Sequence, residues 1–240
     1  MTTVLAIVAH PDDEVIGPGG TLAAHASAGD EVHVLILAEG KTSRGDDPAA
    51  DEKHELSLTE TDGACATLGV KSWRRLNLRD NQLDTYPLLE LARQVGAVVE
   101  ELRPEVVYTH HGGDLNIDHE LTQRATMIAC RPHVSPVRWV LGFPTLSATE
   151  AGFAARPQFT PAVFTDIGAT LATKLAAMSC YGSELCDFPH PRSLPAMRAQ
   201  AELYGAHTGT TAAEGFSVLR GQWQPGQPGQ PGTQEGRCAA

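Results

Sequence analysis

One imidazole and three carboxylates stand together near the start of the chain, where residues 10–14 read His-Pro-Asp-Asp-Glu. They follow an apolar stretch over residues 4–9 that is typical of a fully buried strand. Pro11 favours an extended His10, and proline is also favoured at the first position of a helix, so we expect the chain to turn from strand into helix here. Ligands bind at the carboxyl ends of strands in open α/β sheets, and zinc accepts mixed nitrogen and oxygen donors. The run is therefore a candidate metal site.

A second cluster of the same kind favours the metal site over a purely structural explanation. Acidic residues in the first turn of any helix interact well with its dipole, which alone would account for residues 12–14. Residues 114–119 (Asp-Leu-Asn-Ile-Asp-His), however, follow another strand-like run over residues 106–110. Two histidine-bearing clusters, each directly after a buried strand, are hard to explain by helix capping alone.

Together the two clusters resemble the LmbE-like (PIG-L) deacetylases, zinc-dependent enzymes that remove N-acetyl groups from amino-sugar conjugates. The first motif of that family is similar to Ala-His-Pro-Asp-Asp-Glu at residues 9–14, and the second ends in Asp118-His119. The resemblance covers residues 1–220 in order and spacing. It implies zinc as the cofactor and deacetylation as the reaction.

The resemblance also implies a role for each residue of the two motifs. His10, Asp13 and His119 would bind the zinc ion, which keeps a fourth position for water. Asp12 would act as the general base on that water, and the hydroxide would attack the acetamide carbonyl. Asp118 would orient the site without binding the metal.

The second motif departs from that of many relatives, which carry another histidine three residues before the metal-binding one. This chain has Asn116 there, and an amide does not titrate in the working range, so we expect Asn116 to contact substrate and another group to protonate the leaving amine. His190, between two prolines, is predicted as that acid, with His111 as the alternative. Arg44, in the polar loop over residues 39–48, is a second candidate substrate contact.

Composition limits the class of protein. At 240 residues, with 42% apolar and 20% charged residues, the chain is expected to form one soluble globular domain. The net charge of −11 argues against binding to nucleic acid or acidic membranes. The five cysteines form no Cys-x-x-Cys pair and the N-terminus lacks a basic signal-peptide region, which favours a cytoplasmic protein. No run reaches the roughly 18 apolar residues of a membrane helix. The sequence leaves homo-oligomerisation open.

Strand-like and helical patterns alternate along the chain, which predicts a single-domain α/β fold: a Rossmann-like, mostly parallel sheet with helices on both faces. The domain is expected to span residues 1–220. Residues 221–240 repeat Gln-Pro-Gly and are expected to form a disordered tail without a catalytic role. The predicted strands cover residues 4–9, 31–37, 73–78, 106–110, 138–143 and 162–167, and the predicted helices cover residues 21–26, 51–68, 88–102, 118–130, 169–180 and 194–204.

The sequence thus predicts a zinc-dependent hydrolase that removes an acetyl group from a small-molecule amino-sugar conjugate. An amidase acting on a thiol-sugar conjugate would use the same chemistry. A nucleotide-binding module, with the Gly-Pro-Gly-Gly run at residues 17–20 holding phosphate, is an alternative from another class, although the run does not match Gly-x-Gly-x-x-Gly. A sugar-binding protein without activity is a further alternative, and the presence of Asp12 beside three candidate ligands argues against it.

Overall fold

Strand and helix alternate from the first strand of the chain to the fifth, and each predicted element is present close to its predicted bounds. The computed structural model describes residues 1–40, 50–152 and 156–222. The elements within these ranges are β1 (Thr3–Val8), α1 (Asp13–Ile16), α2 (Gly19–Ser27), β2 (Glu31–Ala38), α3 (Ala50–Leu68), β3 (Ser72–Leu78), the short 3-10 helix η1 (Leu83–Thr85), α4 (Leu88–Leu102), β4 (Val106–His110), α5 (Ile117–Ala129), β5 (Trp139–Phe143), β6 (Val163–Asp166), α6 (Leu171–Cys180), α7 (Leu194–Thr208) and β7 (Ala213–Gly221).

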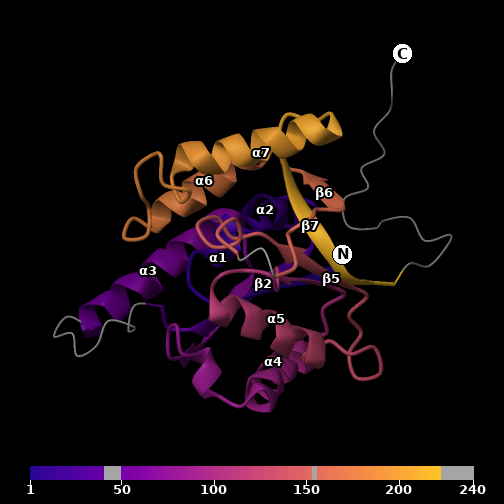
Figure 1. The fold of residues 1–240 in the computed structure, drawn as a ribbon. Helices are drawn as coiled ribbons and strands as arrows, with labels where there is room; N and C mark the ends of the chain where they lie inside the picture. Colours follow the sequence, from indigo (N-terminus) through magenta and orange to yellow (C-terminus); the bar gives the residue numbers. More distant parts are fainter. Residues whose placement is uncertain (41–49, 153–155, 223–240) are drawn as a thin grey trace.

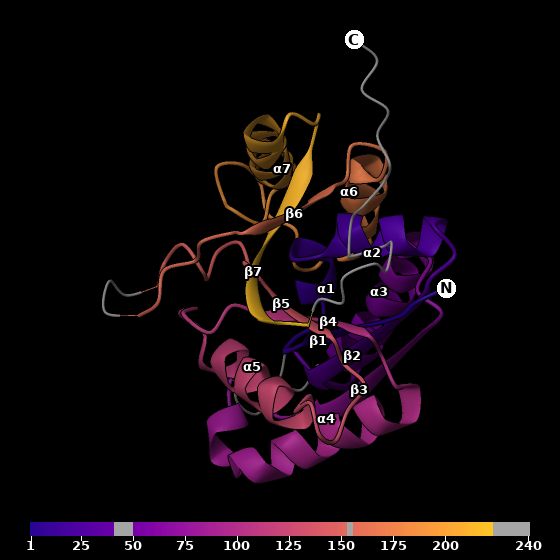
Figure 2. The same ribbon diagram turned by 90° about the vertical axis from the view of Figure 1, so that its right-hand side faces the viewer.

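Within the described residues the strands form one seven-stranded sheet in the order β3-β2-β1-β4-β5-β7-β6. The pairs from β3 to β5 are parallel, whereas β7 runs antiparallel to both of its neighbours. Helices α1, α2, α3, α6 and α7 cover one face of the sheet, and α4 and α5 cover the other (Figure 1, Figure 2). The predicted single-domain α/β fold, with a mostly parallel sheet between two helical layers, is confirmed.

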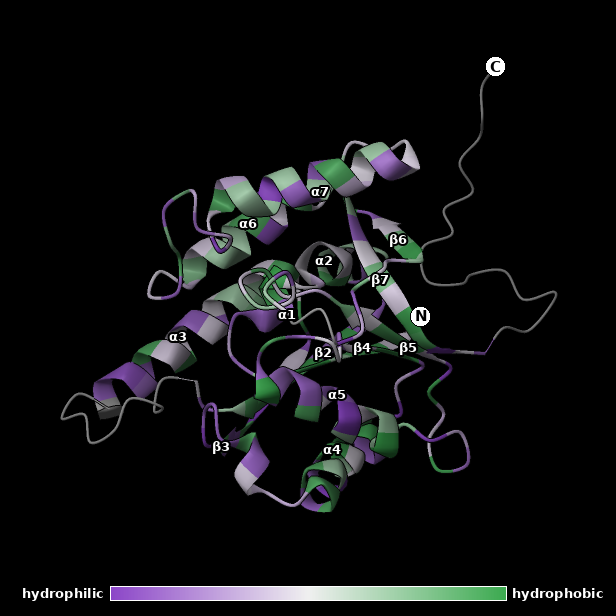
Figure 3. Ribbon diagram, in the orientation of Figure 1, coloured by the Kyte–Doolittle hydropathy of each residue, from purple (hydrophilic) through white to green (hydrophobic). Residues whose placement is uncertain are grey.

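Strand β1 lies at the centre of this sheet and is apolar throughout because both of its faces are covered. Val4, Ala6 and Val8 pack against the layer that contains α2 and α6, and Leu5 and Ile7 pack against α4 and α5. All five side chains are fully buried. Burial of a valine, leucine or isoleucine side chain contributes about 1.5–3 kcal/mol, so the strand that precedes the first motif is firmly held. The flanking helices show hydrophobic and hydrophilic residues side by side, as one-sided burial requires (Figure 3).

The strand order reverses beside β1. The chain moves outward from β1 to β2 and β3, then returns to place β4 on the other side of β1. The carboxyl ends of β1 and β4 therefore lie side by side, and the backbone N–H of Ala9 donates to His110 Nε2 at 2.9 Å. Such a reversal is where open α/β sheets bind ligands, and both sequence clusters begin there.

The chain enters its first helix later than the sequence predicts. Pro11 lies before the helix, and α1 begins at Asp13, because Asp12 has a left-handed backbone (φ 96°) that cannot continue a helix. The helix ends after about one turn at Gly17, where a Cβ would lie 2.3 Å from the ring of Phe143. This glycine thus serves close packing between helix and sheet.

The glycine run at residues 17–20 contacts a buried carboxylate. The backbone N–H groups of Gly20 and Thr21, at the start of α2, donate to Glu214 at 2.9 and 2.8 Å. Glu214 also pairs with Lys174, whose ammonium group donates to carbonyls at the end of α1. A phosphate at this helix start would have to displace Glu214, so the run has a structural role and gives no support to a nucleotide-binding module.

The last described strand, β7, ends at Gly221, one residue beyond the predicted end of the domain. Residues 223–240, which make up most of the predicted tail, lie outside the described residues. Among the helices of the described ranges, none has the length and apolar character needed to cross a membrane. The compartment and the oligomeric state stay predictions.

Candidate active site

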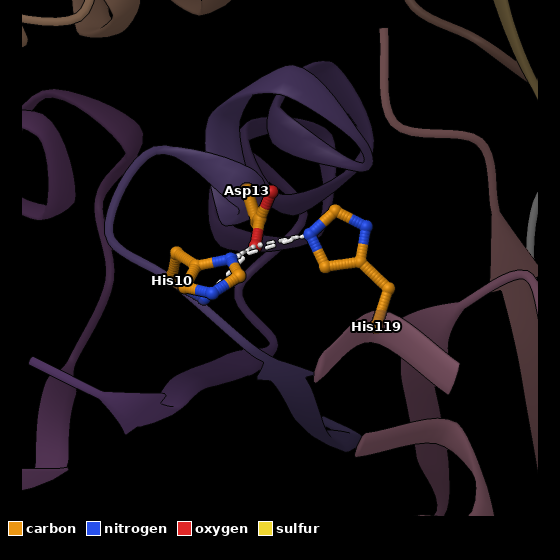
Figure 4. Close-up of side chains that lie close together, drawn as sticks. All are labelled: His10, Asp13 and His119. Atoms are coloured by element: carbon orange, nitrogen blue, oxygen red, sulfur yellow. Dashed lines mark hydrogen bonds and ion pairs between the residues drawn. The ribbon is translucent and has the colours of Figure 1, made fainter. Parts of the chain in front are cut away.

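Three donor atoms converge where strands β1 and β4 end (Figure 4). His10 Nδ1 lies 3.3 Å from both His119 Nε2 and Asp13 Oδ2, and His119 Nε2 lies 3.5 Å from the same Asp13 oxygen. A tetrahedral zinc ion with nitrogen and oxygen ligands at roughly 2.0–2.2 Å separates those ligands by about 3.4 Å. The three side chains therefore fit a zinc ion in both donor type and spacing.

The local fold brings these donors together from two distant parts of the chain. His10 follows β1, and its backbone N–H donates to Asp13 Oδ2 at 2.9 Å, which holds the start of α1 against the strand end. His119 lies in the first turn of α5, where the side chain of the N-cap Asn116 accepts the N–H of Asp118 at 2.8 Å. Because β1 and β4 are neighbours in the sheet, the two turns face each other.

Further carboxylates face the outer nitrogens of the two imidazoles. His10 Nε2 lies 3.2 Å from Asp80 Oδ1 and 3.3 Å from Asp118 Oδ2. His119 Nδ1 lies 3.1 Å from Asp114 Oδ1. A carboxylate beside one ring nitrogen favours the proton there and leaves the lone pair of the other nitrogen for a metal. The arrangement thus leaves His10 Nδ1 and His119 Nε2 as the atoms that could bind a metal.

Two of these carboxylates are held in turn by their own hydrogen bonds. Asp118 Oδ1 accepts the backbone N–H of Leu83 at 3.0 Å. Asp114 accepts the backbone N–H of Asn116 at 2.9 Å and the hydroxyl of Thr149 at 2.7 Å. Both aspartates are fully buried. Their fixed positions restrict the rings of the candidate metal ligands, which is the role that the sequence predicts for Asp118.

Burial and neighbouring charges shift the pKa values of His119 and Asp13 in opposite directions. Burial alone would lower the pKa of His119, but Asp13 and Asp114 beside it raise this pKa to about 9. Burial would raise the pKa of Asp13, but the charge of His119 beside it holds this pKa well below its usual range. Asp13 is therefore ionised at neutral pH, as a carboxylate ligand must be.

His110, at the end of β4, is engaged on both ring nitrogens. Its Nε2 accepts the backbone N–H of Ala9 at 2.9 Å, and its Nδ1 lies 3.0 Å from the hydroxyl of Thr145. A nitrogen that accepts a hydrogen bond carries no proton, so the ring is neutral. Burial, with a contribution from His119, lowers the pKa of His110 to about 4. These contacts indicate that His110 is a buried strand-end residue and not a metal ligand.

Asp12 lies beside the three donors, in the wall of the same cavity, and is only 3% exposed. Burial raises the pKa of Asp12 well above its usual range, Asp13 adds to this shift, and Arg192 opposes it. Arg192 Nη1 lies 3.1 Å from Asp12 Oδ2, and no described residue donates a hydrogen bond to Oδ1. A buried carboxylate with a raised pKa beside a candidate metal site is suited to accept and return a proton.

The cavity that contains these groups has a volume of about 750 Å³, which is within the range of pockets that hold small molecules. Residues of both motifs line it. Helix α3 contributes Leu56, Ser57 and Glu60 to one wall, and the loop after β5 contributes Thr145 and Ser147 to another. The site therefore has room for a molecule much larger than the acetyl group.

The family described as GlcNAc-PI de-N-acetylase, PIG-L, matches residues 5–130, which include both motifs and more than half of the chain. The chain belongs to the PIG-L family. The resemblance indicated by the motifs is thereby confirmed, and so is the prediction of an enzyme of this deacetylase family.

Relatives of this PIG-L chain are named as deacetylases. The diacetylchitobiose deacetylase of Thermococcus kodakarensis is 27% identical over 234 residues, which cover 91% of this chain and 83% of that protein. The uncharacterized deacetylase YaiS of Escherichia coli is 32% identical over 188 residues, covering 75% of this chain and 90% of that protein. The solved structure of the N,N'-diacetylchitobiose deacetylase of Pyrococcus horikoshii has a TM-score of 0.75 at 23% identity and covers 91% of this chain and 84% of that chain. The last comparison shows a shared fold.

The predicted substrate contacts of this PIG-L chain have different outcomes. Asn116 lines the cavity, and its Nδ2 donates to Asn81 Oδ1 at 3.1 Å. Its amide therefore reaches the cavity from the N-terminus of α5. Arg44 lies outside the described residues, so its contact with substrate stays a prediction.

Neither of the two candidate acids is among the described residues that line the cavity. His111 is buried, and its Nε2 lies 2.9 Å from the carbonyl oxygen of Pro157. The ring of His190 is exposed, and its Nδ1 accepts the backbone N–H of Arg192 at 3.1 Å. The assignment of the general acid to His190 stays a prediction, and the structure places its ring outside the cavity wall.

Three residues that contact the motifs are not singled out by the sequence: Asp80, Asp114 and Arg192. Asp80 lies in the polar loop after β3, an edge where ligand-binding residues are expected. Asp114 opens the second cluster, and Arg192 shares the proline-rich loop with His190. For Asp80 and Arg192 the position in a loop is the available signal, because no spacing rule connects these two residues to the motifs.

Proposed function

We propose that this chain hydrolyses the N-acetyl group of an amino-sugar conjugate, with a zinc ion held by His10, Asp13 and His119. The observation that carries the proposal is the triangle of donor atoms beside the buried Asp12 in one cavity. Family membership and a relative named as a diacetylchitobiose deacetylase support an amino sugar as the substrate class. The cavity volume of about 750 Å³ leaves room for the sugar.

The residues of the site have separate roles in the proposed hydrolysis. When bound, a zinc ion supplies a Lewis acid that lowers the pKa of water towards about 7 and polarises a carbonyl group. Asp12 accepts the proton of the attacking water, for which its buried position and raised pKa are suited. Asp80 and Asp118 hold the His10 ring, and Asp114 holds the ring of His119, so that the ligand nitrogens keep their directions.

The departing amine needs a proton to complete the cleavage. Asn116 cannot supply it, because its amide does not titrate. Asp12 lies in the cavity wall and holds the proton taken from water, so it can return this proton to the nitrogen. His190 is the acid predicted from the sequence, and the exposed position of its ring makes Asp12 the better-placed carrier.

A release assay tests the proposed reaction. Purified protein supplied with zinc is incubated with N,N'-diacetylchitobiose and with other N-acetylglucosamine conjugates, and free acetate is measured. We expect acetate release by the wild type, its loss in His119→Ala, and its retention in His207→Ala, which removes an exposed histidine of α7. Equal release by the wild type and His119→Ala would contradict the proposal.

The alternatives from the sequence make different predictions in the same assay. An amidase on a thiol-sugar conjugate would release the larger acyl group of that conjugate and little acetate. A sugar-binding protein without activity would bind N-acetylglucosamine conjugates and release nothing. The chemistry of the donor set favours hydrolysis, because Asp12 stands beside the three candidate ligands.

A further inference from the structure

Arg192 forms an ion pair with the proposed general base: its Nη1 lies 3.1 Å from Asp12 Oδ2. The same Nη1 lies 3.3 Å from Glu184 Oε2, and Arg192 Nε donates to Ser147 Oγ at 3.1 Å. Three segments that are far apart in the sequence thus hold one guanidinium group. The arginine side chain is 33% exposed and lines the cavity, so small solutes can reach it.

The turn before α7 also holds the backbone of this arginine. The N–H of Arg192 donates to His190 Nδ1 at 3.1 Å, and the N–H of Ser193 donates to the carbonyl oxygen of His190 at 3.0 Å. Ser193 is the N-cap of α7, and its side chain accepts the N–H of Ala196 at 3.3 Å. Arg192 is therefore held at both ends, at its backbone by the turn and at its guanidinium group by three side chains.

The two oxygens of Asp12 have different surroundings. Oδ2 has the guanidinium group as a donor, and Oδ1 has no hydrogen-bond donor among the described residues. Asp13 follows in sequence, and Glu184 pairs with the same nitrogen of Arg192, so the Asp12 carboxylate has like charges close to it. A fixed cation at one oxygen restricts the rotation of such a carboxylate.

We propose that Arg192 is a positioning residue, which holds Asp12 by Oδ2 and leaves Oδ1 to accept the proton of the attacking water. The inference rests on the proposed hydrolytic function. A small misplacement of a reacting group costs up to roughly 100-fold in rate, so the effect of Arg192 should appear in kcat. An arginine that bound the substrate directly would instead act on KM.

A double-mutant cycle with Asp12→Asn separates action through Asp12 from any other role. Asparagine tolerates the left-handed backbone at this position, so Asp12→Asn is compatible with the fold. We expect Arg192→Ala to lower kcat by roughly 10- to 100-fold with zinc content and KM nearly unchanged. In the Asp12→Asn background the same change should alter kcat by less than about twofold. Added guanidinium chloride should restore part of the rate of Arg192→Ala and none of the rate of the double variant.

Thermal unfolding of the metal-free protein gives a readout that needs no substrate. Loss of the partner of a buried carboxylate should lower the unfolding midpoint by about 2–4 °C in Arg192→Ala. This loss should be smaller in the Asp12→Asn background, in which Arg192 keeps its contacts with Glu184 and Ser147 but has already lost the ion pair. Arg198→Ala is the matched control, because Arg198 lies on α7 with 51% of its side chain exposed and pairs with Glu202. It should change neither kcat nor the midpoint.

The outcomes distinguish the inference from the function on which it rests. Equal losses of kcat in both backgrounds, or a raised KM with kcat unchanged, would overturn the positioning role while the wild type still released acetate. Equal midpoint shifts in both backgrounds would overturn the pairing itself. A third outcome is a larger midpoint shift from Arg192→Ala in the wild-type background than in the Asp12→Asn background, together with no acetate release by the wild type. That result would overturn the proposed function, and the inference with it.

Discussion

The ring of His110 lies flat against the ring of His119, with centroids 4.0 Å apart and an interplanar angle of 10°. His110 also accepts the backbone N–H of Ala9, the residue just before the first motif. One neutral side chain thus contacts the end of β1 and supports the imidazole that α5 contributes to the donor triangle. This contact connects the two sequence motifs independently of any metal.

We predict that His110→Phe retains zinc but is less stable. Phenylalanine preserves a flat ring against His119 and leaves the buried N–H of Ala9 without an acceptor, which should lower the free energy of unfolding by about 1–3 kcal/mol. Urea unfolding of the metal-free protein and elemental analysis measure the two properties. If His110→Phe lost zinc to the same extent as His119→Ala, His110 would be a ligand and the donor set described here would be wrong.

Asp114→Asn and Asp118→Asn should each weaken zinc binding by roughly 10- to 100-fold, because an amide no longer favours the proton on the outer ring nitrogen. Competition with a chelator measures the affinity. Asp84→Asn, which alters an exposed aspartate in η1, is the matched control and should bind zinc as the wild type does. Identical affinities in all three variants would show that the buried carboxylates do not orient the ligands.

Local signals explain which parts of the fold could be predicted from the sequence. Helix α4 and strand β4 have the predicted bounds, since apolar spacing marks the helix and Pro104 follows its last turn. The start of α1 was predicted two residues too early, because the left-handed backbone of Asp12 depends on packing around it. The antiparallel direction of β7 has no local signal, because it depends on the path of the chain after α7.

In the candidate site, too, residues with a local sequence signal could be predicted, and contacts that depend on the folded chain could not. His10, Asp13 and His119 could be named because their motifs are short and each follows a strand. The contact of His10 with Asp80 depends on the order of three strands, and the contact of Asp12 with Arg192 spans 180 positions of sequence. Neither contact leaves a pattern in the sequence, because both depend on how the loops meet in the folded chain.

Glu14 gives the stability of the protein a pH dependence that can be measured. Its Oε1 accepts the hydroxyl of Tyr181 at 2.6 Å, and burial raises the pKa of Glu14 from 4.5 to about 7. Between these two values the native state keeps a proton that the unfolded chain has released. The contribution of Glu14 to the free energy of unfolding is therefore fully present below this window and is lost as the pH rises through it.

Comparison with Glu14→Gln isolates this effect, because glutamine does not titrate. Between about pH 4 and pH 8, the metal-free wild type should lose about 3 kcal/mol of unfolding free energy relative to the variant. If Glu14→Gln weakens the hydrogen bond with Tyr181, the unfolding free energy of the variant is lower by an amount that does not vary with pH. Glu100→Gln, at an exposed position of α4, should run parallel to the wild type. A constant difference between wild type and Glu14→Gln would mean that folding does not shift the pKa of Glu14.

His190→Asn tests the acid predicted from the sequence against the structural role of the ring. Asparagine offers an oxygen close to the position of His190 Nδ1, so it can accept the N–H of Arg192, but it cannot deliver a proton. We expect His190→Asn to keep turnover within about twofold and His190→Ala to lose more, because alanine removes the acceptor. Loss of turnover in both variants, with a flattened alkaline limb of the pH–rate profile, would assign the acid to His190. Loss in His111→Ala alone would assign it to His111.

The central claim is that Asp12 performs proton transfer beside a zinc ion held by His10, Asp13 and His119. The most direct test measures zinc content and steady-state acetate release in the same preparations of wild type and Asp12→Asn. We predict about one zinc per chain in both proteins and a rate lower by roughly 10²- to 10⁴-fold in the variant. Retention of the rate within about tenfold, or loss of zinc from Asp12→Asn, would contradict it.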